Sequence, residues 1–220
     1  ESAKAWGAYL REVSFYQCLA GSAGLRTPQC YYARIDSHTH DFALLLEDLA
    51  PAQQGDQLAG LSLAQVELGL DEAARLHASH WEDASIDDIP WVDGTRNAPE
   101  MFTPQLVSGL WANFRTQYAD LVDDDCIRVG DALATNFAGY RDGYQGPRCL
   151  IHTDFRSDNL LFGTAQGGYP AAVVDWQSLG FRCCMHDVSY FIAGALPPAQ
   201  RRAHEKHLLQ RYHQALIRLG

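Results

Sequence analysis

The chain has 220 residues, of which 47% are hydrophobic and 11% aromatic, a composition typical of a folded protein with a substantial core. Its formal net charge of -10 argues against sequence-independent binding of nucleic acid, which depends on clustered Lys and Arg. No apolar run is long enough to cross a bilayer and no secretory signal opens the sequence, so we expect a cytoplasmic protein without a membrane partner.

The first part of the chain predicts a helix followed by a β-hairpin. Apolar residues at helical spacing between Trp6 and Ala20 predict an amphipathic helix over about residues 3–20. Two runs rich in β-forming residues, Cys30 to Ile35 and Phe42 to Leu46, flank a polar turn. The Gln-, Gly- and Asp-rich stretch that follows resembles a linker, so we expect a boundary between residues 1–50 and residues 51–220.

The middle of the chain is predicted to be helical. Ser62 and Gln65 form a capping-box pattern, and the apolar spacing that follows predicts a long helix. Thr103 and the proline after it are typical of a helix start, and a further helix is expected over residues 127–140 with Leu133 and Phe137 facing inward.

Short β-type runs then appear at residues 149–151, 160–162 and 171–174, with a turn between the last two. Helices are expected again from about His186 and from Pro198 to the end of the chain. The six cysteines include no C-x-x-C pair, so we expect reduced thiols rather than a zinc site.

The polar segment after the first of these runs carries the candidate chemistry. His152-x-Asp154 followed by Asn159 has the spacing of a kinase catalytic loop, in which the Asp accepts the substrate hydroxyl proton and the Asn binds magnesium. Asp175 closes the last β-type run, where its carboxylate can join Asn159 around a hard cation. We therefore predict Asp154, His152 and Arg156 as catalytic residues and Asn159 and Asp175 as Mg²⁺ ligands.

Arg156 and Asp158 admit two interpretations within this loop. They either contact the substrate or its phosphate, or they form a salt bridge that belongs to the scaffold. His38 with His40 is interpreted as part of a solvated turn, and His77 with His80 as packing beside Trp81, rather than as metal sites.

In combination these motifs resemble the aminoglycoside phosphotransferase and choline kinase superfamily, especially its choline-kinase-like or ecdysteroid-kinase-like branch. The resemblance is carried by residues 150–162, 173–177 and 186–191. It implies an α+β, protein-kinase-like fold: a mostly helical C-lobe with a small catalytic β-hairpin, plus a partial N-lobe of a helix and a hairpin. It also implies an ATP- and Mg²⁺-dependent phosphotransferase that acts on a hydroxyl group of a small molecule.

Carried over residue by residue, the resemblance assigns further roles. The backbone around Glu47, Asp48 and Leu49 would meet the adenine of ATP. Glu12 matches the acidic residue that pairs with a phosphate-binding lysine, and Asp187 matches a carboxylate that braces the catalytic loop.

Two departures from the family pattern stand out. Thr153 occupies a position where the family often has glycine. The only lysine upstream of Glu12 is Lys4, which falls on the same predicted helix, and no glycine-rich loop precedes it. The resemblance therefore predicts that the first strands of the N-lobe are absent from this chain.

Two other functions stay open at this point. The missing lysine favours a truncated or pseudokinase-like module that binds a ligand without transferring phosphate. A metal-dependent phosphoesterase could use the same carboxylates. Aminoglycoside, choline, steroid and sugar acceptors all fit the motifs, and the oligomeric state is left open.

Overall fold

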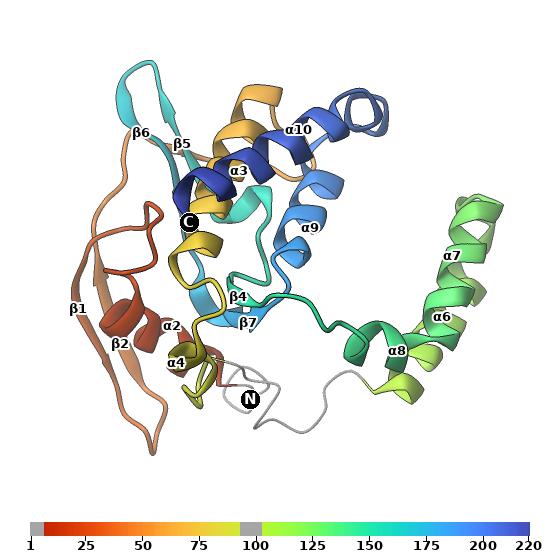
Figure 1. Ribbon diagram of the computed structural model, residues 1–220, viewed down its shortest axis with the longest axis horizontal. Helices are drawn as coiled ribbons and strands as arrows, with labels where there is room; N and C mark the ends of the chain where they lie inside the picture. The colour runs from red at the N-terminus through yellow and green to blue at the C-terminus, as the bar shows by residue number, and fades with distance from the viewer. Residues whose placement is uncertain (1–6, 93–102) are drawn as a thin grey trace. The chain divides into compact units, whose positions relative to one another are not determined.

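The computed structural model describes residues 7–92 and 103–220. The chain forms two compact units, one of Glu1–Arg96 with Pro147–Gly220 and one of Asn97–Gly146 (Figure 1). All the predicted site residues belong to the larger unit. The expected boundary between an N-lobe and a C-lobe near residue 50 stays a prediction.

The larger unit opens with a helix that changes its winding. Helix α2 (Ala8–Ser14) continues as the π-helical turn η1 (Phe15–Leu19), so the predicted helix is present over its described part. The ring of Phe15 is buried and stacks on that of Trp176, with 3.8 Å between the ring centroids. Lys4 lies outside the described residues.

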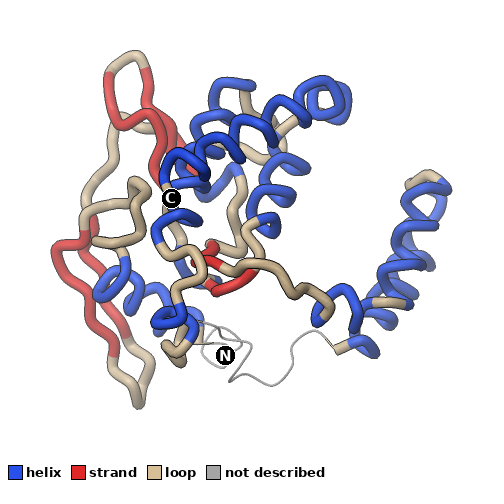
Figure 2. The backbone as a smooth tube through the Cα atoms, viewed as in Figure 1, coloured by secondary structure: helices blue, strands red, loops and turns tan. Residues whose placement is uncertain are grey.

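The predicted first hairpin is confirmed with the same bounds. Strands β1 (Cys30–Ile35) and β2 (Phe42–Leu46) pair antiparallel beside α2 (Figures 1 and 2). Ala33 and Leu44 face the core, whereas Tyr32 and Leu45, directly opposite each other, face solvent. This alternation gives the two-stranded sheet one apolar face to bury.

The remaining strands form two small sheets. The first joins β3 (Gln53–Gln54), β5 (Leu160–Thr164) and β6 (Gly167–Val173) in the order β3-β5-β6. The second pairs β4 (Cys149–Ile151) with β7 (Gly180–Arg182). The β5–β6 hairpin is present where the sequence predicts a hairpin, whereas β3 and β7 were not predicted. Strand β3 falls in the stretch that resembled a linker.

Helix α3 (Leu63–Ser79) packs against strands β4 and β6, and two further helices pack against α3. Helix α3 begins at the predicted capping box and lies beside both α9 (Met185–Ala195) and α10 (Pro198–Leu219) (Figure 1). A Cβ atom at Gly69 of α3 would come within 2.6 Å of two ring atoms of Phe191, so glycine allows α3 and α9 to approach closely. The short α4 (Ala84–Asp87) follows α3.

The smaller unit contains α6 (Pro104–Tyr118), the 3₁₀ turn η2 (Ala119–Leu121), α7 (Asp124–Thr135) and α8 (Phe137–Asp142). Thr103 caps α6 as predicted. The predicted single helix over residues 127–140 is wrong: Asp123 caps a helix that begins earlier, and Asn136 breaks it.

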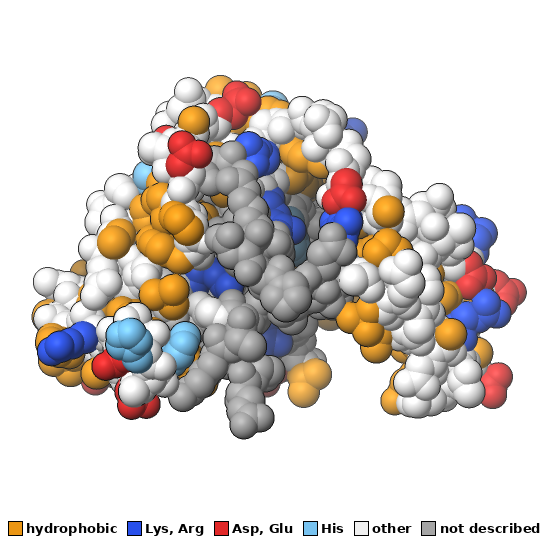
Figure 3. Space-filling model, turned by 90° about the horizontal axis from the view of Figure 1, so that it is seen from below, with side chains coloured by type: hydrophobic (Ala, Val, Ile, Leu, Met, Phe, Trp, Pro, Cys, Tyr) orange, Lys and Arg blue, Asp and Glu red, His pale blue; other side chains and the backbone are white. Residues whose placement is uncertain are grey.

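None of the residues in the described helices of this unit is buried. Leu133 is 42% exposed, against its prediction as an inward residue, and orange apolar side chains are visible on the unit in Figure 3. Trp111 of α6 donates a hydrogen bond from Nε1 to Asp131 of α7 at 2.8 Å, which ties the two helices together. Among the helices of both described parts, none combines the length and hydropathy needed to cross a membrane.

Candidate functional site

The register of the β5–β6 hairpin brings the two predicted metal ligands to one end of a sheet. Leu160 pairs with Val173, and one step further the N–H of Val174 donates to the backbone oxygen of Asn159 at 3.0 Å. Asp175 then turns into the left-handed backbone region with φ 68°. Asn159 and Asp175 therefore leave the same end of one hairpin.

Asp154 is held against this hairpin end by Asn159. The Nδ2 atom of Asn159 donates to the backbone oxygen of Asp154 at 2.9 Å and to its Oδ2 atom at 3.1 Å. Both bonds use the amide nitrogen, so the amide oxygen is left as the atom that can face a cation. The side chain of Asp154 is 39% exposed, which keeps its carboxylate accessible to a substrate.

Arg156 lies beside Asp154 and forms ion pairs. Its Nε atom is 3.6 Å from Oδ2 of Asp154, and its Nη2 atom is 3.3 Å from Oδ2 of Asp158. Asp158 is held in turn by the N–H of Gln57, at 3.0 Å from Oδ1. The structure thus shows the scaffold contacts of Arg156, while its partly exposed guanidinium can still meet an incoming anion.

His152 is fully buried, and both of its ring nitrogens have partners. Nε2 is 3.0 Å from the backbone oxygen of Val174, which can only accept, so the proton is assigned to Nε2. Nδ1 then accepts the N–H of Asp154 at 3.3 Å. The ring links the catalytic loop to the residue before Asp175, a location suited to positioning rather than to contact with a substrate.

Asp187 of α9 braces the same loop. Its Oδ2 and Oδ1 atoms accept the N–H groups of His152 and Thr153 at 2.7 and 2.8 Å. Burial by itself would raise the pKa of Asp187, but hydrogen bonds from the His77 ring and the backbone N–H of His152 oppose it, and this pKa lies below its ordinary value. The carboxylate is therefore an ionised anchor for the catalytic loop.

Thr153 shows why glycine suits this position. Its φ of 67° is an unfavourable conformation for a β-branched residue. Two bonds hold it there: its N–H donates to Asp187, and its hydroxyl donates to the backbone oxygen of Ser178.

Glu12 of α2 lies beside the hairpin end. Burial and, to a smaller extent, the nearby Asp175 together raise its pKa to about 7, against the opposing effect of a hydrogen bond from the N–H of Trp176. Arg11 ties α2 to this region by donating from Nη1 to the backbone oxygen of Gln177 at 2.5 Å. The structure thus brings Glu12 next to Asp175, whereas Lys4, upstream of it, is not among the described residues.

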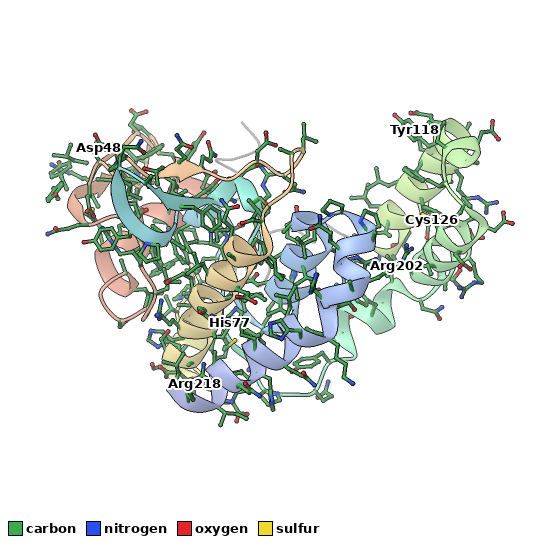
Figure 4. All side chains as sticks on the ribbon, turned by 90° about the horizontal axis from the view of Figure 1, so that it is seen from above. Asp48, His77, Tyr118, Cys126, Arg202 and Arg218 are labelled. Carbon is green, nitrogen blue, oxygen red and sulfur yellow. The ribbon has the colours of Figure 1, made fainter. Side chains whose placement is uncertain are left out.

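The predicted hinge residues make scaffold contacts with their side chains. The Oε2 atom of Glu47 accepts from Nη2 of Arg26 at 2.5 Å and from the N–H of Gln29 at 2.9 Å. Oδ1 of Asp48, labelled in Figure 4, accepts the N–H of Ala50 at 2.9 Å. The backbone oxygen of Leu49 accepts from Ala52. Contact with an adenine would therefore involve other backbone groups of this segment.

Sequence reasoning missed several residues that support the site. His77, which was predicted to pack beside Trp81, is buried against Asp187 and Tyr212. The hydroxyl of Thr27 lies between strand β6 and Trp176. A histidine on the apolar face of a predicted helix signals a buried polar partner, but it does not say which one. In the described part of the chain, no group of three or more His, Cys, Asp or Glu residues forms a metal cluster.

The comparisons with known proteins agree with this geometry. The sequence matches the profile of the phosphotransferase enzyme family over residues 4–218. A comparison with curated proteins finds no match.

Solved structures show similarity over nearly the whole chain. Amicoumacin kinase hAmiN, in complex with AMP-PNP, Ca²⁺ and Ami, has a TM-score of 0.54 and 13% identity, covering 94% of this chain and 62% of that one. An aminoglycoside-3'-phosphotransferase of type VIII has a TM-score of 0.52 and 17% identity, with coverage of 96% and 74%. Spectinomycin phosphotransferase APH(9)-Ia, in complex with ADP and spectinomycin, has a TM-score of 0.52 and 15% identity, with coverage of 94% and 63%.

The present chain thus spans 62 to 74% of the length of these three structures. At such identities the likeness concerns the fold. It confirms the α+β, kinase-like architecture expected from the sequence.

Proposed function

This chain belongs to the phosphotransferase enzyme family, and we propose that it transfers a phosphoryl group from ATP to a hydroxyl group of a small molecule. The observation that carries the proposal is the convergence of Asp154, Asn159 and Asp175 at one end of the β5–β6 hairpin. Phosphoryl transfer depends mainly on positioning and electrostatic stabilisation, which rigid groups at a strand end can supply.

The donor set at this end fits a magnesium ion. The carboxylate of Asp175 and the amide oxygen of Asn159 are oxygen ligands, which Mg²⁺ prefers, and we propose that these two side chains hold it. When bound, the ion would neutralise negative charge on the phosphates. The backbone of residues 47–49 is the proposed contact for the adenine.

The other site residues are proposed to have separate roles. Asp154 is the proposed base: its carboxylate accepts the acceptor's hydroxyl proton, while the amide of Asn159 fixes its orientation. His152 and Asp187 position the loop rather than touch the substrate, since both side chains are buried. Arg156 is proposed to meet a phosphate oxygen from its place beside Asp154.

The test is Asp154→Asn, which keeps the shape of the side chain and an oxygen that can accept from Asn159. We expect transfer from ATP to fall by about 10²–10⁴-fold with an unchanged melting temperature, because a general base is lost without a change in packing. Asp71→Asn, a matched change in the partly exposed ion pair between Asp71 of α3 and Arg211 of α10, should leave transfer intact. The assay follows phosphorylation of aminoglycoside, choline, steroid and sugar acceptors with Mg²⁺ and after its removal by chelation.

The outcomes separate the competing functions. A fully active, folded Asp154→Asn variant would refute the assignment of the base. Binding of ATP with no transfer to any acceptor would support a pseudokinase-like module, whereas release of phosphate from a phosphomonoester without an acceptor would support a phosphoesterase. The choline-kinase-like branch stays a prediction that the same acceptor panel tests.

A further inference from the structure

A buried chain of polar side chains runs from the last helix to the catalytic loop. The hydroxyl oxygen of Tyr212 on α10 is 2.8 Å from Nδ1 of His77 on α3, and Nε2 of His77 is 3.2 Å from Oδ2 of Asp187 on α9. Figure 4 labels His77 on α3, the helix that packs along α10. The three side chains are at least 97% buried, and the proposed mechanism uses neither Tyr212 nor His77 directly.

The directions of these hydrogen bonds follow from the acceptor at one end. Both carboxylate oxygens of Asp187 already accept backbone N–H groups of the catalytic loop, so Asp187 acts as an ionised acceptor. Asp187 therefore favours the His77 tautomer that donates from Nε2. In a neutral imidazole this leaves Nδ1 as an acceptor, and the hydroxyl of Tyr212 is the donor that meets it.

We infer that Tyr212 and His77 are positioning residues, in which the Tyr212 hydroxyl fixes the His77 tautomer that donates to Asp187 and thereby holds the backbone before Asp154. The inference extends the proposed function, since it assigns a route from α10 to the proposed base. It also gives a role to a buried histidine that metal binding does not explain.

Other titratable groups lie against the side chains of Tyr212, His77 and Asp187 and would influence any effect of pH on them. Cys184, the N-cap of α9, contacts Tyr212 and also Cys149 of β4. His152 of the catalytic loop also faces Asp187, to which its backbone N–H donates a hydrogen bond. A simple packing role for Tyr212 would predict that only the volume of its ring matters, so the hydroxyl is the group to remove.

The first experiment requires no kinetics. Long-range ¹H–¹⁵N NMR of the His77 ring in the unmodified protein should show the proton on Nε2. In Tyr212→Phe, we expect a mixture of tautomers and exchange of the His152 and Thr153 amide hydrogens that is about tenfold faster, because the anchor of these amides is weakened. The control is Tyr190→Phe, which removes a hydroxyl from a partly exposed tyrosine of α9 and should change neither.

The second experiment is a double-mutant cycle on phosphoryl transfer. Tyr212→Phe should lower kcat about tenfold with less than about a twofold change in the KM for ATP, as expected when a partner behind the reacting groups is lost. In the His77→Gln background, an amide N–H donates to Asp187 without any choice of tautomer. Adding Tyr212→Phe to that background should therefore lower kcat by less than about twofold.

Two results would overturn the inference: a His77 proton on Nδ1 in the unmodified protein, or equal losses from Tyr212→Phe in both backgrounds. The NMR arm also separates this inference from the proposed function. If no acceptor is phosphorylated, the proposed function fails, while the tautomer and the amide exchange still decide the role of Tyr212.

Discussion

The backbone of Thr153 is left-handed because its N–H must reach Asp187 while its hydroxyl reaches Ser178. This conformation costs a residue with a Cβ atom about 1–2 kcal/mol, partly offset in glycine by the greater freedom of the unfolded chain. We predict that Thr153→Gly is more stable than Thr153→Ala by about 0.5–1 kcal/mol, since both lack the hydroxyl and only alanine keeps the strain. Urea unfolding of the two variants measures this difference.

An ordinary helical position provides the control for that comparison. Ala203 lies exposed on α10, where Ala203→Gly should lower the free energy of unfolding by about 1 kcal/mol. Glycine is thus expected to stabilise at residue 153 and to destabilise at residue 203. Alanine proving the better residue at both positions would contradict strain at Thr153.

The carboxyl group of Glu12 should make the stability depend on pH. Burial and the neighbouring Asp175 raise its pKa from 4.5 to about 7. Between these values the folded protein keeps a proton that the unfolded chain releases, so stability falls as the pH rises from about 4.5 to 7. Glu12→Gln is predicted to remove this decline. At pH 8 its free energy of unfolding should be higher than that of the unmodified protein by at most about 3 kcal/mol, since one pKa unit corresponds to about 1.4 kcal/mol.

Urea unfolding at several pH values without divalent cations measures the effect of Glu12. The partial exposure of this side chain to water makes the stated value an upper limit. Glu205→Gln, a matched change on the outer side of α10, should leave the pH dependence unaltered. A parallel decline in Glu12→Gln and the unmodified protein would refute the role of Glu12.

The sequence predicted those site residues that lie close to one another along the chain. Asp154 and Asn159 are five positions apart, and their spacing alone predicted that they act together. The support behind them is remote: His77 and Tyr212 are 135 positions apart, so no spacing pattern could join them. His152 was predicted as catalytic because the motif gives the residue type, whereas only the structure gives its burial.

At the scale of elements, signals that lie within a few residues of each other predicted the structure well. Ser62 and Thr103 mark the starts of α3 and α6 because each accepts a hydrogen bond from an N–H group within its own first turn. Strands β3 and β7 contain two and three residues, and such short strands exist only through their partners elsewhere in the chain. No local sequence pattern could therefore have predicted strands β3 and β7.

The loop after strand β6 depends on Thr27, which comes from a distant segment. The buried Thr27 hydroxyl donates to the backbone oxygen of Val173 at 2.9 Å and accepts from Nε1 of Trp176 at 3.0 Å. We predict that Thr27→Val lowers the free energy of unfolding by about 2 kcal/mol, since it keeps the shape but leaves two buried polar groups without this partner. Thr27→Ser keeps the hydroxyl and should lose less than about 1 kcal/mol; equal stability of the valine variant and the unmodified protein would contradict the bridge.

Over the whole molecule, contacts between distant segments hold the site together. Arg11 meets Gln177 across 166 positions, and the backbone of Arg26 is bound both by Glu72 of α3 and by Val173 of β6. Residues 8–92 and 147–220 therefore build one core between them, with the smaller unit inserted in the sequence. The family resemblance predicted the α+β, kinase-like fold because it compares the whole chain, but it did not predict the separate unit of Asn97–Gly146.

Asp187 is the point where several distant segments meet, so its charge should matter to the entire larger unit. Its carboxylate accepts from His152, Thr153 and His77, and an amide at this position would place an NH₂ group against one of these donors. We predict that Asp187→Asn lowers the free energy of unfolding at pH 7 by about 3 kcal/mol. Asp71→Asn, which alters the partly exposed ion pair between Asp71 of α3 and Arg211 of α10, should lose less than about 1 kcal/mol.

The contribution of Asp187 to stability should depend on pH in a defined direction. The pKa of Asp187 is below its ordinary value of 3.8 in the folded protein, so its contribution is present above that pH and is lost as the pH falls further. Asp187→Asn has no such contribution to lose, and its stability should therefore fall less steeply below about pH 4 than that of the unmodified protein. Urea unfolding between pH 3 and 7 measures both slopes, and identical slopes would show that the carboxylate is not ionised in the fold.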